Sequence, residues 1–201
     1  MDSTAAIGFW GQLEQADKAA TLAINSVHCP ASDFVWQVFS DKEIWYPLYL
    51  IVLIFLFIRL GWKKALVVTL SCILTVAACD QLANFTKEFF ARFRPCWDEW
   101  MISGNLHLLE GKGNYYGFYS AHAANAFGFA ICSWLGFRND TRLKWRGYGW
   151  GICIWGVLVG VSRIFVGKHF LGDVIVGLLV GALFGWLMAT LARLVIRRFR
   201  L

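Results

Sequence analysis

Residues 162–173 read SRIFVGKHFLGD and span the junction between two long apolar runs, 147–166 and 172–192. Each run comes close to the roughly 20 apolar residues that an α-helix needs to cross the hydrocarbon core of a bilayer. The short link between them nevertheless carries four ionisable side chains: Arg163, Lys168, His169 and Asp173. Because a charged group near a bilayer is costly, such a cluster indicates a specific pairing or a functional site.

The composition of the whole chain favours a membrane protein. Of its 201 residues, 58% are hydrophobic and only 16% are charged, against about 25% charged in a typical soluble domain. Three further apolar runs precede the two already named, so transmembrane helices are predicted at 44–62, 65–86, 119–137, 147–166 and 172–192. The predicted fold is an all-α, polytopic membrane helical bundle of about five spans, built as a single domain, 1–201.

The segment before the first span, 1–43, is predicted to be helical and interfacial, and 44–201 to form the catalytic bundle. Apolar residues recur in it at helical spacing: Phe9, Leu13, Ala16, Ala20, Ile24 and Val27. Such a stripe suits a helix that lies in the membrane interface or packs on the bundle. No C-x-x-C pair occurs, so neither a zinc site nor a disulfide framework is indicated. Cys29 and Cys96 lie outside the apolar runs and remain candidates for pairing.

The basic residues indicate the orientation. The links after the first and third spans and the C-terminal tail contain Arg59, Lys63, Lys64, Arg138, Arg142, Lys144, Arg146, Arg193, Arg197, Arg198 and Arg200, with Asp140 as the only acid. By the positive-inside rule these segments face the cytoplasm. The net charge of +6 therefore comes from short clusters between apolar runs, and nucleic acid is not an expected partner.

A second charged stretch, KEFFARFRP, occupies residues 87–95 on the outward side. Lys87 and Arg94 are two helical turns apart, so both are predicted to project from one face of a helix that Pro95 ends. Two cations on one stripe at a membrane surface suit an anion, because Arg grips phosphate oxygens in a bidentate way. The alternative is that both side chains only snorkel towards lipid headgroups.

A third stretch, YSAHAANAF, opens the third apolar run at residues 119–127. Ser120 is a preferred N-cap residue. The backbone N–H groups after it would point outward, as a helix N-terminus that holds anions, and His122 falls in this first turn. The alternative is a capped helix with an incidental histidine.

In SRIFVGKHFLGD, His169 and Asp173 stand at i and i+4, so the carboxylate can accept a hydrogen bond from one imidazole nitrogen if both are helical. That contact fixes the tautomer and leaves the other nitrogen free to attack. Arg163 lies six residues before His169 and can reach the same pocket. The alternative is an interfacial ion pair.

The span count places all three stretches on the outer side of the membrane. Together they offer three cations, a helix N-terminus, a histidine–carboxylate pair and a second histidine, which is what phosphoryl transfer through a phosphohistidine needs. A two-metal phosphatase requires clustered carboxylate ligands instead. Besides Asp173 the three stretches contain only Glu88, so no metal is expected.

These stretches resemble the type-2 phosphatidic acid phosphatase family, the membrane relatives of vanadium haloperoxidases, from about residue 44 to the end of the chain. The family signature is K-x6-R-P, then P-S-G-H, then S-R-x5-H-x3-D. The first and third elements match in full, at 87–95 and 162–173, whereas the second reads YSAH, with Tyr119 and Ala121 at the odd positions. Alanine keeps the backbone donor but requires an αR or β conformation there. Tyr119 is expected to add a wall to the pocket.

The resemblance implies a role for each matching residue. His169 would be the nucleophile on phosphorus, Asp173 its orienting partner, and His122 the general acid that protonates the leaving oxygen. The phosphate and its transition-state charge would be held by five groups: Lys87, Arg94, Ser120, the N–H of Ala121, and Arg163.

We therefore predict a metal-independent, cofactor-free membrane lipid phosphatase or pyrophosphatase that acts at the outer leaflet on a lipid such as undecaprenyl pyrophosphate. The alternatives within the family are a lipid A phosphatase and a phosphatidylglycerol phosphate or phosphatidate phosphatase. Those from other classes are an inactive lipid-phosphate binder and an anion transporter. The expected partners are the lipid phosphate and membrane lipids, and the expected state is a monomer or weak homo-oligomer. The expected location is the bacterial inner membrane, multi-pass, with the site facing the periplasm.

Three other features carry expectations of their own. Glycines at 177, 181 and 185 are predicted to let helices of one chain approach closely. Asp80, inside the second span, is expected to be hydrogen-bonded within the bundle. The link from Cys96 to Tyr119 is the candidate cap over the pocket.

Overall fold

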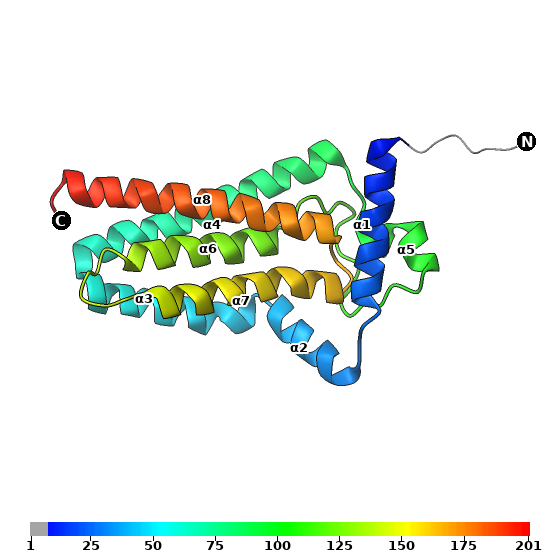
Figure 1. Ribbon diagram of the computed structural model, residues 1–201, viewed down its shortest axis with the longest axis horizontal. Coiled ribbons are helices and arrows are strands. Elements are labelled where there is room, and N and C mark those ends of the chain that lie inside the picture. Colours follow the sequence, from blue (N-terminus) through cyan, green and yellow to red (C-terminus); the bar gives the residue numbers. More distant parts are fainter. Residues whose placement is uncertain (1–7) are drawn as a thin grey trace, which may run out of the picture.

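The computed structural model describes residues 8–201, and every regular element in them is helical. The α-helices are α1 (Phe9–Asn25), α2 (Pro30–Ser40), α3 (Tyr46–Leu60), α4 (Trp62–Phe90), α5 (Glu99–Ser103), α6 (Ala121–Phe137), α7 (Arg146–Phe165) and α8 (Leu171–Arg198), with 3-10 turns at Glu43–Trp45 and Pro95–Trp97. The predicted all-α bundle is confirmed. Figure 1 shows α3, α4, α6, α7 and α8 running side by side, with α1 crossing one end.

The five predicted spans correspond to α3, α4, α6, α7 and α8. Within residues 8–201, four helices are long and apolar enough to cross a membrane: Glu43–Leu60, Trp62–Phe90, Arg146–Phe165 and Leu171–Arg198. The remaining helix, α6, has 17 residues and is the central one, because it packs against α4, α7 and α8. Most of its residues are buried, and many are Ala or Gly.

The α8 glycines allow α8 to lie directly on α6. A Cβ added at Gly177 would lie 2.6 Å from the carbonyl oxygen of Ser120, and one added at Gly185 would lie 2.5 Å from that of Gly128. The predicted close packing within one chain is confirmed. One consequence is that the N-termini of α6 and α8 meet, where the Ser120 amide donates to the Asp173 carbonyl at 3.0 Å.

The N-terminal segment is helical as predicted, but it forms two helices, and α1 docks on the bundle through polar side chains. Phe9 and Leu13, on the expected apolar stripe, are 70% and 53% exposed. The buried face carries Asp17, Thr21 and Asn25, which reach the ends of α7 and α8. The reason is that helix ends leave unpaired N–H and C=O groups, which only polar side chains can satisfy.

These contacts are specific. The Gly172 amide donates to Asp17 Oδ1 at 2.8 Å, and the Leu171 amide donates to Thr21 Oγ1 at 2.9 Å, which caps the start of α8. Asn25 Nδ2 donates to the Ile164 carbonyl at the end of α7, at 3.0 Å. Helix α1 therefore holds the two helices that flank the α7–α8 link.

The two cysteines that were candidates for pairing, Cys29 and Cys96, are both free thiols.

The opposite end of the bundle gathers the basic links and the C-terminus (Figure 1). There Asp140, whose side chain is 1% exposed, accepts from Arg59 Nη2 at 2.8 Å and from Arg142 Nε at 2.8 Å. The segments predicted to be cytoplasmic thus share one end, and the three motif stretches share the other.

Candidate active site

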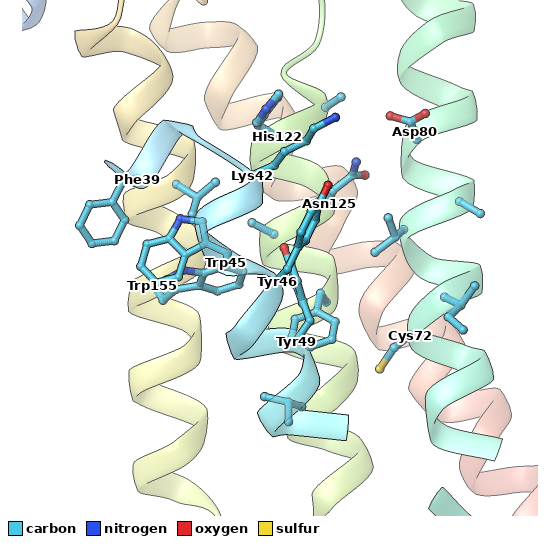
Figure 2. Close-up of a pocket in the computed structure, with 18 of the residues that line it drawn as sticks. Phe39, Lys42, Trp45, Tyr46, Tyr49, Cys72, Asp80, His122, Asn125 and Trp155 are labelled. Carbon is cyan, nitrogen blue, oxygen red and sulfur yellow. The ribbon is translucent and has the colours of Figure 1, made fainter. Parts of the chain in front are cut away.

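The three motif stretches converge on a cleft of about 800 Å³ between α3, α4, α6 and α7. Its lining includes five of the predicted site residues, Lys87, Arg94, Ala121, His122 and His169, and also Asp80. Away from them the cleft is lined mainly by apolar and aromatic side chains, among them Trp45, Tyr49, Val52, Phe129 and Trp155. Figure 2 shows His122 near one end of the cleft, with the rings of Trp45, Tyr49 and Trp155 further along.

His169 and Asp173 form the expected pair. His169 Nδ1 lies 3.3 Å from Asp173 Oδ2, which also accepts the Phe170 amide at 3.1 Å. Both side chains are buried, with the carboxylate wholly so. Since Nδ1 faces the carboxylate, Nε2 is the nitrogen left for chemistry. The pKa of His169 is lowered to about 4, chiefly by burial and also by the charges of Arg94 and Arg163, against the raising effect of Asp173. The imidazole is therefore neutral at pH 7 and has its lone pair available.

Arg92 is the site residue that sequence reasoning missed. Its Nη1 lies 2.7 Å from Asp173 Oδ1, and its Nη2 lies 2.7 Å from Asp17 Oδ2. The guanidinium also lies over the Phe170 ring, 4.2 Å from its centroid. Burial opposes the charged form of Arg92, yet the two carboxylates raise its pKa. Arg92 and α1 thus fix the carboxylate that orients His169, and Arg92 occupies an unspecified position within the K-x6-R-P pattern.

The first motif adopts a different backbone from the predicted one. Helix α4 ends at Phe90, because Ala91 takes a left-handed conformation with φ of 46°. The chain then runs extended, so that the Arg94 amide donates to the Tyr115 carbonyl at 2.8 Å. The prediction that Lys87 and Arg94 share one helical face, ended by Pro95, is wrong, although both residues line the cleft.

The second motif begins α6 as expected. Ser120 Oγ accepts the Ala123 amide at 3.4 Å, and Ala121 is the first helical residue. Tyr119 is 1% exposed and donates its hydroxyl to the Cys79 carbonyl of α4 at 2.8 Å. It braces α6 against α4 and does not line the cleft, so the expectation of a pocket wall is wrong.

Arg163 lies beside the cleft but does not line it. It is 5% exposed, and its Nη1 donates to Ser40 and to Glu110 Oε1, the latter at 3.2 Å. Its Nε is buried without a partner among residues 8–201. The link before α6 therefore does reach the site, through Glu110 and through Gly111, whose carbonyl accepts from Lys168 Nζ.

A separate cluster of ionisable groups, not indicated by the sequence, lies away from the cleft. His107 Nε2 is 3.0 Å from Asp33 Oδ2, and the His107 ring stacks on His28 at 3.7 Å between centroids. The ligand atoms of these three side chains lie close enough to share a metal ion. The cluster ties the link before α6 to the start of α2, and none of its members lines the cleft.

The site combines a buried histidine–carboxylate pair, two cleft cations and an N-capped helix. Their order along the chain matches a known family. The sequence matches the PAP2 superfamily over residues 65–197. The chain belongs to the PAP2 superfamily. It is accordingly a multi-pass membrane protein and a phosphoric ester hydrolase.

Curated relatives of this PAP2 protein carry two kinds of name. It is 32% identical over 182 residues to the lipid A 4′-phosphatase of Bacteroides thetaiotaomicron, and this alignment covers 90% of this chain and 78% of the relative. It is 35% identical over 174 residues to that of Porphyromonas gingivalis, covering 85% and 70%. An undecaprenyl-diphosphatase of Sulfolobus acidocaldarius is 31% identical over 146 residues, covering 72% and 61%.

A solved PAP2 structure confirms the fold. The crystal structure described as the first transmembrane PAP2 type phosphatidylglycerolphosphate phosphatase, from Bacillus subtilis, superposes with a TM-score of 0.73. The sequences are 21% identical, and the match covers 90% of this chain and 87% of that one.

Proposed function

We propose that this PAP2 protein is a lipid phosphate phosphatase whose preferred substrate is a lipid A-type phosphate, taken from the outer leaflet of a bacterial inner membrane. From the sequence alone, undecaprenyl pyrophosphate was the first candidate and lipid A an alternative. The two lipid A 4′-phosphatases match more of the chain than the undecaprenyl-diphosphatase does, and this reverses the order. Undecaprenyl pyrophosphate is the second candidate.

The observation that carries the proposal is the His169–Asp173 pair beside a largely apolar cleft. A lipid phosphate presents the same division, with a charged head and apolar chains. The basic links at the far end of the bundle support an outward-facing site. Residues 1–43 and 44–201 act as one catalytic unit in this account, because α1 reaches Asp173 through Asp17 and Arg92.

The proposed reaction has two steps. His169 Nε2 attacks phosphorus, the P–O bond to the lipid breaks, and protonated His122 gives its proton to the leaving oxygen. Water, deprotonated by His122, then attacks the phosphohistidine, which releases inorganic phosphate and restores His169. Asp173 holds Nδ1 and stabilises the positive charge that develops on the ring.

Stabilisation of the phosphoryl charge is the larger part of the catalysis, because uncatalysed phosphate ester hydrolysis is extremely slow. Lys87 and Arg94 supply positive charge from the cleft wall. Ser120, the Ala121 amide and Arg163 complete the proposed phosphate cradle, with the N-terminus of α6 contributing its partial positive charge. No step requires a metal ion or another cofactor.

The test is phosphate release by the full chain purified in detergent with EDTA present. Lipid A, undecaprenyl pyrophosphate, phosphatidylglycerol phosphate and phosphatidate are compared, with His169→Ala as the inactive variant. The proposal predicts release in EDTA, fastest from lipid A and abolished by His169→Ala. Release that needs a divalent metal, or that survives His169→Ala, would contradict it.

A further inference from the structure

The cleft contains a level of polar side chains between the catalytic groups and its apolar part. This level, called the polar belt below, consists of three residues that line the cleft: Lys42, Asp80 and Asn125. Asn125 follows His122 by three residues on α6, which places it about 4.5 Å further along the helix. Figure 2 shows the three side chains directed into the cleft from the α2–α3 link, α4 and α6.

The polar belt has hydrogen-bonding capacity that the rest of the protein does not use. Asn125 Oδ1 is buried and has no partner among the residues that the structure describes. Asp80 accepts only a long contact, 3.4 Å, from Asn84, and neither Asp80 nor Lys42 forms a salt bridge within residues 8–201. An unpaired buried carbonyl costs about 1–3 kcal/mol, so Asn125 is suited to meet a polar atom of a ligand. Asp80 is half-buried and Lys42 is exposed, so both remain accessible to the same ligand.

The charges of the polar belt decide which polar atoms it suits. Lys42 and Asp80 together carry no net charge, so the polar belt adds no net attraction for a second phosphate. The belt offers acceptors in Asp80 and Asn125 and a donor in Lys42. Hydroxyl, ester and amide groups of a neutral sugar match this set, whereas a prenyl chain has nothing to pair with it.

We infer that the polar belt is a sugar-binding subsite that makes the enzyme prefer phosphates carried on an acylated sugar over polyprenyl diphosphates. This inference rests on the proposed lipid phosphatase function and adds the chemical class of the group that bears the phosphate. A subsite built to hydrogen-bond a substrate rejects an analogue that lacks the polar group, because its own groups are then left unpaired.

The test compares two probes, 4′-monophosphoryl lipid A and undecaprenyl diphosphate, on the wild-type chain and on Asn125→Leu, Asp80→Asn and Lys42→Met. The control is Ile73→Val, which lines the apolar part of the same cleft. We expect each polar-belt variant to lose about 5- to 150-fold in kcat/KM for the sugar lipid, while kcat/KM for the prenyl diphosphate is retained. Ile73→Val should change both substrates alike.

Binding measured on the His169→Ala background separates this inference from the proposed function. If the wild-type chain hydrolyses neither lipid, but Asn125→Leu still weakens binding of the sugar lipid alone, the subsite stands and the proposed function fails. The subsite is overturned if the polar-belt variants lose kcat/KM and binding affinity equally for both lipids. It is also overturned if neither quantity changes for either lipid. Thermal unfolding of each variant shows whether a loss reflects misfolding.

Discussion

Replacing Arg92 by methionine tests whether the network behind the nucleophile matters to catalysis. Asp173 is wholly buried, and among the residues that the structure describes Arg92, whose Nη1 lies at 2.7 Å, is its only cationic partner, since His169 is neutral. Removing one member of a buried ion pair costs about 3–5 kcal/mol. The Arg92 side chain is 24% exposed, which places the expected cost near the lower limit of this range.

A loss of about 3 kcal/mol corresponds to roughly 100-fold in kcat/KM if it falls on the transition state. Because Arg92 orients the pair and does not reach the lipid in this account, the loss should appear in kcat more than in KM. Arg92→Lys, which keeps the charge, should restore part of the activity. Asp17→Asn, which keeps an oxygen for the Gly172 amide, should cost only about 1 kcal/mol, or roughly 5-fold.

The chain offers a matched control at its other end. Arg59 Nη2 pairs with the buried Asp140 at 2.8 Å, and its side chain is 26% exposed. Arg59→Met should lower the unfolding temperature as Arg92→Met does, yet leave kcat per folded molecule unchanged. The reasoning is refuted if Arg92→Met loses no more kcat than Arg59→Met, with both rates measured by phosphate release on folded, monodisperse protein.

Three further predictions follow from the geometry. Because burial lowers the pKa of His169 to about 4, the acid limb of kcat/KM should lie near pH 4, and a limb near pH 6.5 contradicts the assignment. The folded state then binds fewer protons than the unfolded state between these values, so unfolding experiments should show stability decreasing as the pH falls through this window. A Cβ at Gly117 would lie 2.9 Å from Arg94 Cγ, so Gly117→Ala should displace Arg94 and reduce kcat/KM. The control is Gly151→Ala, whose Cβ would meet nothing within 4 Å and which should leave kcat/KM unchanged. Gly181→Ala should cost about 1–3 kcal/mol through overpacking against α6, measured as a lower unfolding temperature without a change in the pH profile.

Local sequence patterns predicted the bundle well because hydropathy and small-residue spacing act over one or two helical turns. The apolar runs located α3, α4, α6, α7 and α8, and the glycine spacing predicted close helix packing within one chain, without identifying α6 as the partner of α8. The His169–Asp173 pair was also accessible, since an i,i+4 contact depends only on local helical geometry.

What the sequence could not supply are contacts between distant segments. Arg92 and Asp173 are 81 residues apart, and Asp17 is a further step away on α1. The Arg94 backbone was misjudged because a left-handed Ala91 is rarely expected from sequence. The polar docking face of α1 was hidden behind a more obvious apolar stripe, since helix-end capping becomes visible only when the bundle is assembled.

The central claim is that His169 carries the phosphoryl group during turnover. The most direct measurement is to quench the wild-type chain at alkaline pH during turnover of a lipid phosphate and locate the modification by mass spectrometry. The account predicts an acid-labile phosphate on His169 Nε2, absent from His169→Ala and retained in smaller amount in Arg92→Met. Turnover without any phosphoenzyme, or a phosphate on another residue, would contradict it.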